Sequence, residues 1–279
     1  MMEILEVGYK ANGRSLITDV SLRIEAGRFV AIVGPNGAGK STFLKLLTGE
    51  LTPACGSIRL EGRDLKRYRQ PELARRRAVL AQQNHVSLPF SVREIVMMGR
   101  YPFHKNAPEE RDFAIVEACL REVEMLGLAD RVFPTLSGGE QQRAQLAKAL
   151  AQIWEITGAF LFLDEPTNGL DLRHQCHSLE IARQLAGKGT GVVAVLHDLN
   201  MALQYADEVV MMQHGKVYAK GRPEETLTEE NIRRVFDVQV RLVKLPESGE
   251  RIVLEVGNRK SAIGNQESAI SDRKSAIGK

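Results

Sequence analysis

A glycine-rich stretch between an apolar run and an amphipathic segment constrains the fold of this chain more than any other feature. Residues 29–33 are apolar and β-branched, which predicts a buried strand. Residues 34–41 then match G-x-x-x-x-G-K-[ST], and a helical pattern follows. In this context glycines let successive N–H groups point at phosphate oxygens. The stretch therefore predicts a phosphate-binding loop, with a ligand-free glycine turn as the alternative.

The composition is typical of a globular protein with one large or two small domains. The chain has 279 residues, of which 43% are hydrophobic and 26% are charged, and its net charge is +3. That charge is too small to indicate nucleic-acid binding. No apolar run approaches the length of a membrane span, and the N-terminus lacks a signal-peptide pattern. Three widely separated cysteines fit no metal or redox spacing and indicate a reducing compartment.

The remaining sequence predicts strands around a helical insert. Residues 3–9 and 16–24 flank Asn12-Gly13, which predicts a hairpin. Helical patterns at 92–98 and 108–126 predict the insert. Residues 238–244 and 251–256 predict a final two-stranded ribbon. From residue 258, Ser-Ala-Ile recurs every seventh residue in a polar setting, which predicts a disordered tail.

Two further motifs lie in the second half of the chain. Residues 136–143 read L-S-G-G-E-Q-Q-R, in which Ser137 and Glu140 form a capping-box pattern before an Ala/Leu-rich helix. Glycines in a first helical turn are poor helix formers, so they suggest close approach of an anion to bare N–H groups. The apolar run 159–163 delivers Asp164 and Glu165 at a strand end, where open α/β sheets bind ligands, and the run 191–196 ends at His197.

These motifs together resemble the ATP-binding cassette (ABC) family, from residue 3 to about residue 236. The glycine loop alone leaves kinases, GTPases and helicases open, and the L-S-G-G-E stretch is the specific signal. The resemblance implies an α/β fold: a P-loop NTPase core with a mostly parallel sheet, an N-terminal antiparallel β subdomain and a helical subdomain at about residues 84–150. It implies a cassette over residues 1–236, a short β extension at 237–257 and the repetitive tail at 258–279.

The resemblance implies that ATP and Mg²⁺ are cofactors and assigns the site residues. Lys40, Glu165 and His197 are expected to be catalytic, with Glu165 as the general base. Ser41, Gln82 and Asp164 are expected at Mg²⁺, with Gln83 as the less favoured choice for the glutamine. Tyr9 is expected to stack on adenine. The residues expected to contact the nucleotide are Tyr9, Gly34, Pro35, Asn36, Gly37, Ala38, Gly39, Lys40, Ser41, Thr42, Gln82, Ser137, Gly138 and Gly139.

In this family the L-S-G-G-E signature acts on the nucleotide of the opposite subunit. The resemblance therefore implies a head-to-tail homodimer with two ATP molecules at its interface. Residues 168–171 read N-G-L-D where the family commonly has Ser-Ala before Leu-Asp. Asp171 is kept, so this departure bears on coupling between the two sites rather than on hydrolysis.

Residues 97–102 resemble the branch serving iron-siderophore, haem and cobalamin importers, and 73–80, 152–155 and 197–200 are most similar to its haemin importers. This implies a permease dimer as partner, a periplasmic or surface binding protein indirectly, and a place on the cytoplasmic face of the plasma membrane. Alternatives are a soluble ABC ATPase acting on DNA or ribosomes and a nucleotide-binding module without turnover. For His174, Cys176 and His177 a polar helix face is favoured over a metal or haem site.

Overall fold

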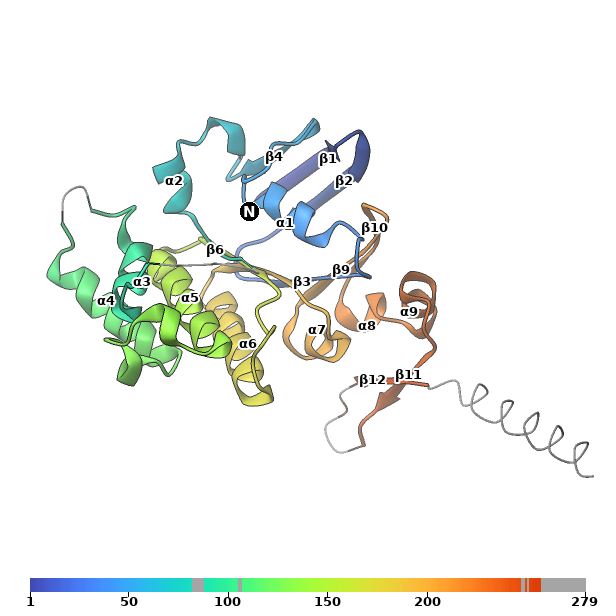
Figure 1. Cartoon of the computed structure of the whole chain (residues 1–279). Helices are drawn as coiled ribbons and strands as arrows, with labels where there is room; N and C mark the ends of the chain where they lie inside the picture. The colour runs from blue at the N-terminus through green and yellow to red at the C-terminus, as the bar shows by residue number, and fades with distance from the viewer. Residues whose placement is uncertain (82–87, 105–106, 247–248, 250, 257–279) are drawn as a thin grey trace, which may run out of the picture. The chain divides into compact units, whose positions relative to one another are not determined.

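The computed structural model describes residues 1–81, 88–104, 107–246, 249 and 251–256 (Figure 1). Residue contacts divide the chain into two compact units, Met1–Leu227 and Thr228–Lys279. The cassette boundary at residue 236, inferred from the resemblance, stays a prediction. Residue 82, the expected glutamine ligand, and the repetitive tail lie outside the described residues.

A mostly parallel sheet forms the centre of the first unit, with strand order β10-β9-β3-β8-β7-β6. Its strands are β3 (Phe29–Val33), β6 (Arg77–Leu80), β7 (Phe160–Asp164), β8 (Gly191–Val195), β9 (Glu208–Gln213) and β10 (Lys216–Gly221). Among the described residues of this sheet, only the pairing of β10 with β9 is antiparallel. Every residue of β3, β7 and β8 is buried, as expected for central parallel strands covered on both faces.

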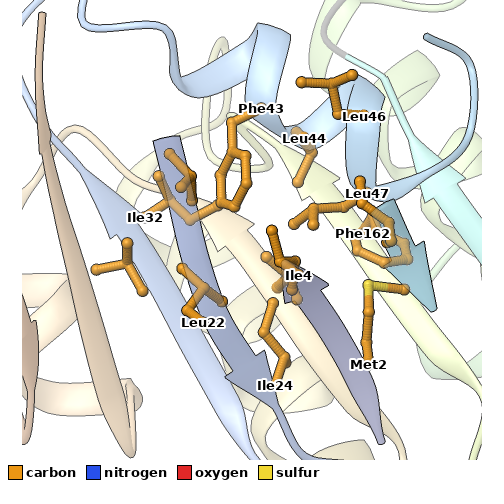
Figure 2. Close-up of a cluster of buried hydrophobic side chains, with 14 of the residues drawn as sticks. Met2, Ile4, Leu22, Ile24, Ile32, Phe43, Leu44, Leu46, Leu47 and Phe162 are labelled. Carbon is orange, nitrogen blue, oxygen red and sulfur yellow. The ribbon is translucent and has the colours of Figure 1, made fainter. Parts of the chain in front are cut away.

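An antiparallel sheet covers one face of the parallel sheet. Its order is β2-β1-β4-β5, from β1 (Met2–Ala11), β2 (Arg14–Ile24), β4 (Cys55–Leu60) and β5 (Arg63–Asp64). The predicted hairpin is confirmed, with Asn12 at φ 50° and Gly13 at φ 76° in the turn. Helix α1 (Lys40–Leu47) lies between the sheets. Figure 2 shows the shared core, in which the labelled side chains are Met2, Ile4, Leu22, Ile24, Ile32, Phe43, Leu44, Leu46, Leu47 and Phe162.

Helices cover the other face of the central sheet. Figure 1 shows α5 (Gly138–Ile153), α6 (Leu172–Gly187) and α7 (Leu199–Tyr205) on the side opposite α1. The remaining helices of this unit are α2 (Gln70–Ala74), α3 (Val92–Met97), α4 (Glu110–Glu122) and α8 (Pro223–Thr226), with short 3₁₀ turns η1 (Leu65–Arg67), η2 (Met98–Arg100), η3 (Leu126–Leu128) and η4 (Phe133–Thr135). Among the described residues no helix combines the length and apolar character needed to cross a membrane.

Helices α3, α4 and α5 pack on one another, which confirms the predicted helical insert. The helix predicted from about residue 108 to residue 126 is present as α4 (Glu110–Glu122), but it ends four residues earlier than expected. The helix stops there because Glu124 adopts a left-handed conformation at φ 55°. Inside the insert, Arg100 Nε donates to Asp112 Oδ1 at 2.8 Å, and both side chains are almost fully buried.

The second unit contains a helix and a two-stranded ribbon. Helix α9 (Glu229–Phe236) begins after Thr228, whose hydroxyl oxygen accepts a hydrogen bond from the Asn231 N–H. Strands β11 (Val240–Lys244) and β12 (Arg251–Glu255) pair antiparallel, as the sequence predicts. The Glu229 carboxylate accepts the Leu242 N–H at 2.9 Å, which attaches the helix to the ribbon.

Candidate functional site

The glycine loop connects β3 to α1, as its motif predicts. Gly39 has φ 97°, and a Cβ placed there would lie 2.8 Å from the Leu16 carbonyl oxygen, so no larger residue fits. Lys40 begins α1 and is buried, and its Nζ donates to the Gly34 and Pro35 carbonyls at 2.7 and 3.0 Å. Burial lowers the pKa of Lys40, whereas nearby Glu165 and Asp164 oppose that shift. The two hydrogen bonds to the backbone hold the Lys40 side chain within the loop.

The carboxyl end of β7 places Asp164 beside the first residues of α1. The Ser41 hydroxyl donates to Asp164 Oδ1 at 3.2 Å. Asp164 is only 5% exposed, and burial raises the pKa of its carboxyl. A hydroxyl and a carboxylate oxygen side by side are hard donors of the kind that Mg²⁺ prefers. These two residues therefore fit a magnesium ion.

Glu165 and His197 meet across two neighbouring strand ends. The His197 Nε2 lies 2.6 Å from Glu165 Oε1, and the side chains are 48% and 14% exposed respectively. Glu165 has φ 53°, a conformation that is strained for a glutamate and that clusters at functional sites. Because β7 and β8 are parallel neighbours, residues following their ends fall at one edge of the sheet. The two expected catalytic side chains are thus in contact.

Tyr9 lies on β1, near the glycine loop. It pairs with Ile17 of β2, and the Ile17 side chain would lie 3.0 Å from a Cβ placed on Gly39. The tyrosine ring is half-buried. Thr42, one residue after Ser41, is also half-buried in α1. Tyr9 is therefore one strand removed from the loop that it is expected to serve.

The signature residues form the capped start of α5. Ser137 Oγ accepts the Glu140 N–H at 3.3 Å, and Glu140 Oε2 accepts the Ser137 N–H at 2.8 Å, so the predicted capping box is present. That backbone hydrogen bond is the main cause that lowers the pKa of Glu140. Gly138 is exposed, and a Cβ there would meet nothing within 4 Å. At Gly139 a Cβ would lie 3.3 Å from the Leu170 side chain, so the signature touches the loop after β7.

Gln175 of α6, which the sequence did not single out, holds this loop. Gln175 Nε2 donates to the Thr167 and Leu170 carbonyls at 3.2 and 2.9 Å. Asp171 caps α6 by accepting the His174 N–H at 2.9 Å, and this bond is the main cause that lowers the pKa of Asp171. The sequence has no signal for Gln175, because its partners are backbone carbonyls that only the folded loop brings near.

The histidines of α6 have separate partners. His174 Nδ1 lies 2.8 Å from Asp171 Oδ1. His177 Nε2 lies 2.8 Å from the Glu122 carbonyl oxygen at the end of α4, so it must donate. The two rings therefore serve helix capping and helix packing.

Comparisons with known proteins identify the relatives of this chain. A family model described as "ABC transporter" matches residues 17–168. The hemin import ATP-binding protein HmuV of Hahella chejuensis is 42% identical over 257 residues, covering 91% of this chain and 99% of that protein.

Solved structures show the same fold. The inward-facing conformation of a metal-chelate type ABC transporter aligns with a TM-score of 0.77 and 26% identity, covering 92% of this chain and 97% of that chain. A dimeric post-hydrolysis state of the ATP-binding cassette MJ0796, bound to ADP and Pi, aligns with a TM-score of 0.70 and 25% identity, covering 80% of this chain and 99% of that one. This chain therefore belongs to the ABC transporter family, as one of its ATP-binding subunits.

Proposed function

We propose that this chain hydrolyses ATP at the edge of the central sheet and that the strand-end cluster performs the chemistry. This cluster comprises Lys40, Ser41, Asp164, Glu165 and His197. The observation that carries the proposal is their convergence: the Ser41–Asp164 contact of 3.2 Å and the Glu165–His197 contact of 2.6 Å both lie at this edge. Phosphoryl transfer to water depends mainly on positioning and charge neutralisation, and these residues supply both.

Lys40 and the loop N–H groups supply positive charge that attracts the terminal phosphates. The N-terminal end of α1 adds its partial positive charge to the lysine. Ser41, Asp164 and, by resemblance, Gln82 would hold Mg²⁺, which supplies further charge neutralisation when bound. Tyr9 stacks on the adenine, because an aromatic face next to the loop suits a purine base.

Glu165 acts as the general base that orients the attacking water. Its contact with His197 fixes the carboxylate, and the histidine is well placed to contact the γ-phosphate. Ser137, Gly138 and Gly139 grip the nucleotide of a second copy, so the active unit is a head-to-tail homodimer. The likeness to MJ0796, a cassette observed as a dimer, supports that arrangement.

The energy of hydrolysis drives uptake of haemin through a partner permease dimer, with a periplasmic or surface binding protein delivering the cargo. The hemin import relative supports haemin as substrate, and the metal-chelate type transporter supports iron-siderophores as the second candidate, with cobalamin a third by resemblance. For each of these three cargoes the chain lies on the cytoplasmic face of the plasma membrane. Nucleic acid plays no part in this function.

Purifying the tagged chain from its own membranes tests the transport assignment. The co-purifying permease is identified by mass spectrometry and reconstituted with the chain in vesicles. ATP-driven transport is then compared for haemin, a ferric siderophore and cyanocobalamin. We expect transport of haemin that requires Lys40. Transport of another cargo alone overturns the haemin assignment, and ATP hydrolysis without any co-purifying permease overturns the importer assignment.

A further inference from the structure

The C-terminal turn of α4 is unusual in both conformation and partners. We call residues 122–125 the α4 end turn. The Glu124 N–H donates to the Arg121 carbonyl at 3.1 Å, and the Met125 N–H donates to the Leu120 carbonyl at 2.7 Å. These two bonds, with Glu124 at φ 55°, form a Schellman motif. Glycine is the usual residue at that left-handed position, and in α4 a glutamate occupies it.

The Glu124 side chain reaches across to α6. Arg173 Nη2 donates to both carboxylate oxygens of Glu124, each at 2.9 Å. Arg173 follows Asp171, the cap of α6, by two residues. The side chains are 74% and 43% exposed, so this ion pair contributes little to folding stability. The pair links the start of α6 to the end of α4.

The carbonyls of residues 122–124 in this turn accept hydrogen bonds from two other helices. The last carbonyls of a helix lack partners within it. His177 of α6 donates to the Glu122 carbonyl at 2.8 Å. Arg143 of α5 donates to the Val123 and Glu124 carbonyls, each at 3.3 Å. The α4 end turn therefore joins the helix that carries the signature to the helix that follows the loop after β7.

Both joined helices begin at functional segments that touch. Helix α5 starts with Gly138 and Gly139, and Gly139 packs against Leu170. Helix α6 starts after Asp171, and its Gln175 holds Thr167 and Leu170 by their carbonyls. A shift of α5 against α6 would therefore move the signature relative to the loop that leads from Glu165.

We propose that Arg173 and Glu124 are positioning residues. They hold the signature turn of one copy in the position that binds the ATP of the other copy. This inference rests on the proposed function. The pair lies in α6 and just after α4, and neither residue belongs to the strand-end cluster. Its loss should leave nucleotide binding to the glycine loop intact and weaken ATP-dependent pairing of two copies.

Charge reversal in a Glu165→Gln background tests the proposal, since that variant is expected to bind ATP with greatly reduced turnover. Arg173→Glu should raise the ATP concentration for half-maximal dimer formation by about tenfold, within the range of coupling between distinct sites. Adding Glu124→Arg should restore most of the dimer. The matched control is the swap of Arg121 and Glu117, an exposed pair within α4 alone, which should change nothing. An unaltered dimer in Arg173→Glu, or no rescue by the swap, overturns the proposal.

Glu124→Gly separates positioning from capping. Glycine suits the left-handed position, so thermal stability should stay equal or rise while the ATP requirement for pairing increases. Unchanged pairing in this variant would show that Glu124 acts only as a cap. If the Glu165→Gln parent itself does not pair, the proposed function fails. Amide hydrogen exchange at residues 137–142 then still tests whether Arg173 and Glu124 position the signature. Faster exchange in Arg173→Glu and Glu124→Gly supports that role, and unchanged exchange contradicts it.

Discussion

The strand-end cluster and the signature turn (Ser137, Gly138 and Gly139) are held by different means. Members of the cluster lie at or just after the ends of buried parallel strands or begin α1, and Ser41 contacts Asp164 as Glu165 contacts His197. The signature turn begins a helix of the insert, with Ser137 and Gly138 exposed. Its contact with the loop after β7 is made through Gly139 and Leu170.

The two regions should therefore respond differently to substitution. The cluster is fixed by a sheet whose central strands are fully buried, so substitutions there should change reaction or binding with little change in fold. The signature turn depends on side chains that join α4, α5 and α6, such as Arg143 and His177. Substitutions around it should change stability or pairing before they change chemistry.

The largest effect is expected at the cluster. Glu165→Gln should lower turnover by about 10²–10⁴-fold, the usual contribution of a positioned general base, and should leave ATP binding intact. Phosphate release and equilibrium nucleotide binding measure the two quantities. Glu110→Gln, an exposed carboxylate of α4, is the control and should keep full activity. Hydrolysis at the parent rate in Glu165→Gln would show that another group is the base.

The largest stability effect is expected in the insert. Asp112→Ala should lower the free energy of unfolding by about 3–5 kcal/mol, because it leaves Arg100 buried without its carboxylate partner. Glu117→Ala removes an exposed partner of Arg121 and should change it by about 0.5 kcal/mol or less. Chemical denaturation measures both. Equal losses would refute the distinction between the buried and the exposed pair.

The same pair predicts a pH dependence. Burial alone would raise the pKa of Asp112, but the Glu109 N–H and the Arg100 guanidinium overcome it and hold the pKa below its usual range. The stabilisation is therefore complete above the unfolded pKa of about 3.9 and is lost as the pH falls through the lower folded value. Asp112→Asn should reduce this acid-side loss in a thermal melt. An unchanged acid-side slope would contradict the assignment.

Lys40 should affect binding more than stability. Lys40→Ala should weaken ATP binding by about 10–100-fold, the loss of a charge-assisted hydrogen bond of about 1.5–3 kcal/mol. Its Tm should not fall, since burial disfavours the charged lysine. Lys216→Ala, on the exposed face of β10, serves as the control for equilibrium dialysis. Unchanged affinity in Lys40→Ala would remove the lysine from the phosphate site.

The smallest effect compares two capping boxes. Ser137→Ala and Ser91→Ala should each lower stability by about 1 kcal/mol, because each serine caps a helix of the insert through the same pattern. Only Ser137→Ala should also weaken ATP-dependent pairing. Pairing is measured by size-exclusion chromatography in the Glu165→Gln background. Equal pairing defects in both variants would mean that insert stability, rather than the signature, controls pairing.

Most of the strand-end cluster could be predicted from sequence, because its residues lie in contiguous motifs at the ends of apolar runs. The contact between Glu165 and His197 was not predicted, since it depends on β7 and β8 being neighbours in the sheet. Gln175 and Arg173 gave no signal, because Gln175 binds backbone carbonyls of the folded loop and Arg173 binds a residue far away in the sequence. The early end of α4 was missed because a glutamate occupies the left-handed position where glycine is the usual signal.

Mixing two inactive variants tests most directly whether the cluster of one copy works with the signature of another. Lys40→Ala disables the loop, and Gly138→Asp places a negative charge at the exposed signature turn, where a Cβ meets nothing within 4 Å. Each variant alone should be inactive. Mixing should restore ATP hydrolysis, since the heterodimer contains one site with an intact glycine loop from the Gly138→Asp copy and an intact signature from the Lys40→Ala copy. Activity restored only by mixing is the predicted result. No activity on mixing, while the heterodimer demonstrably forms, would contradict a site shared between copies.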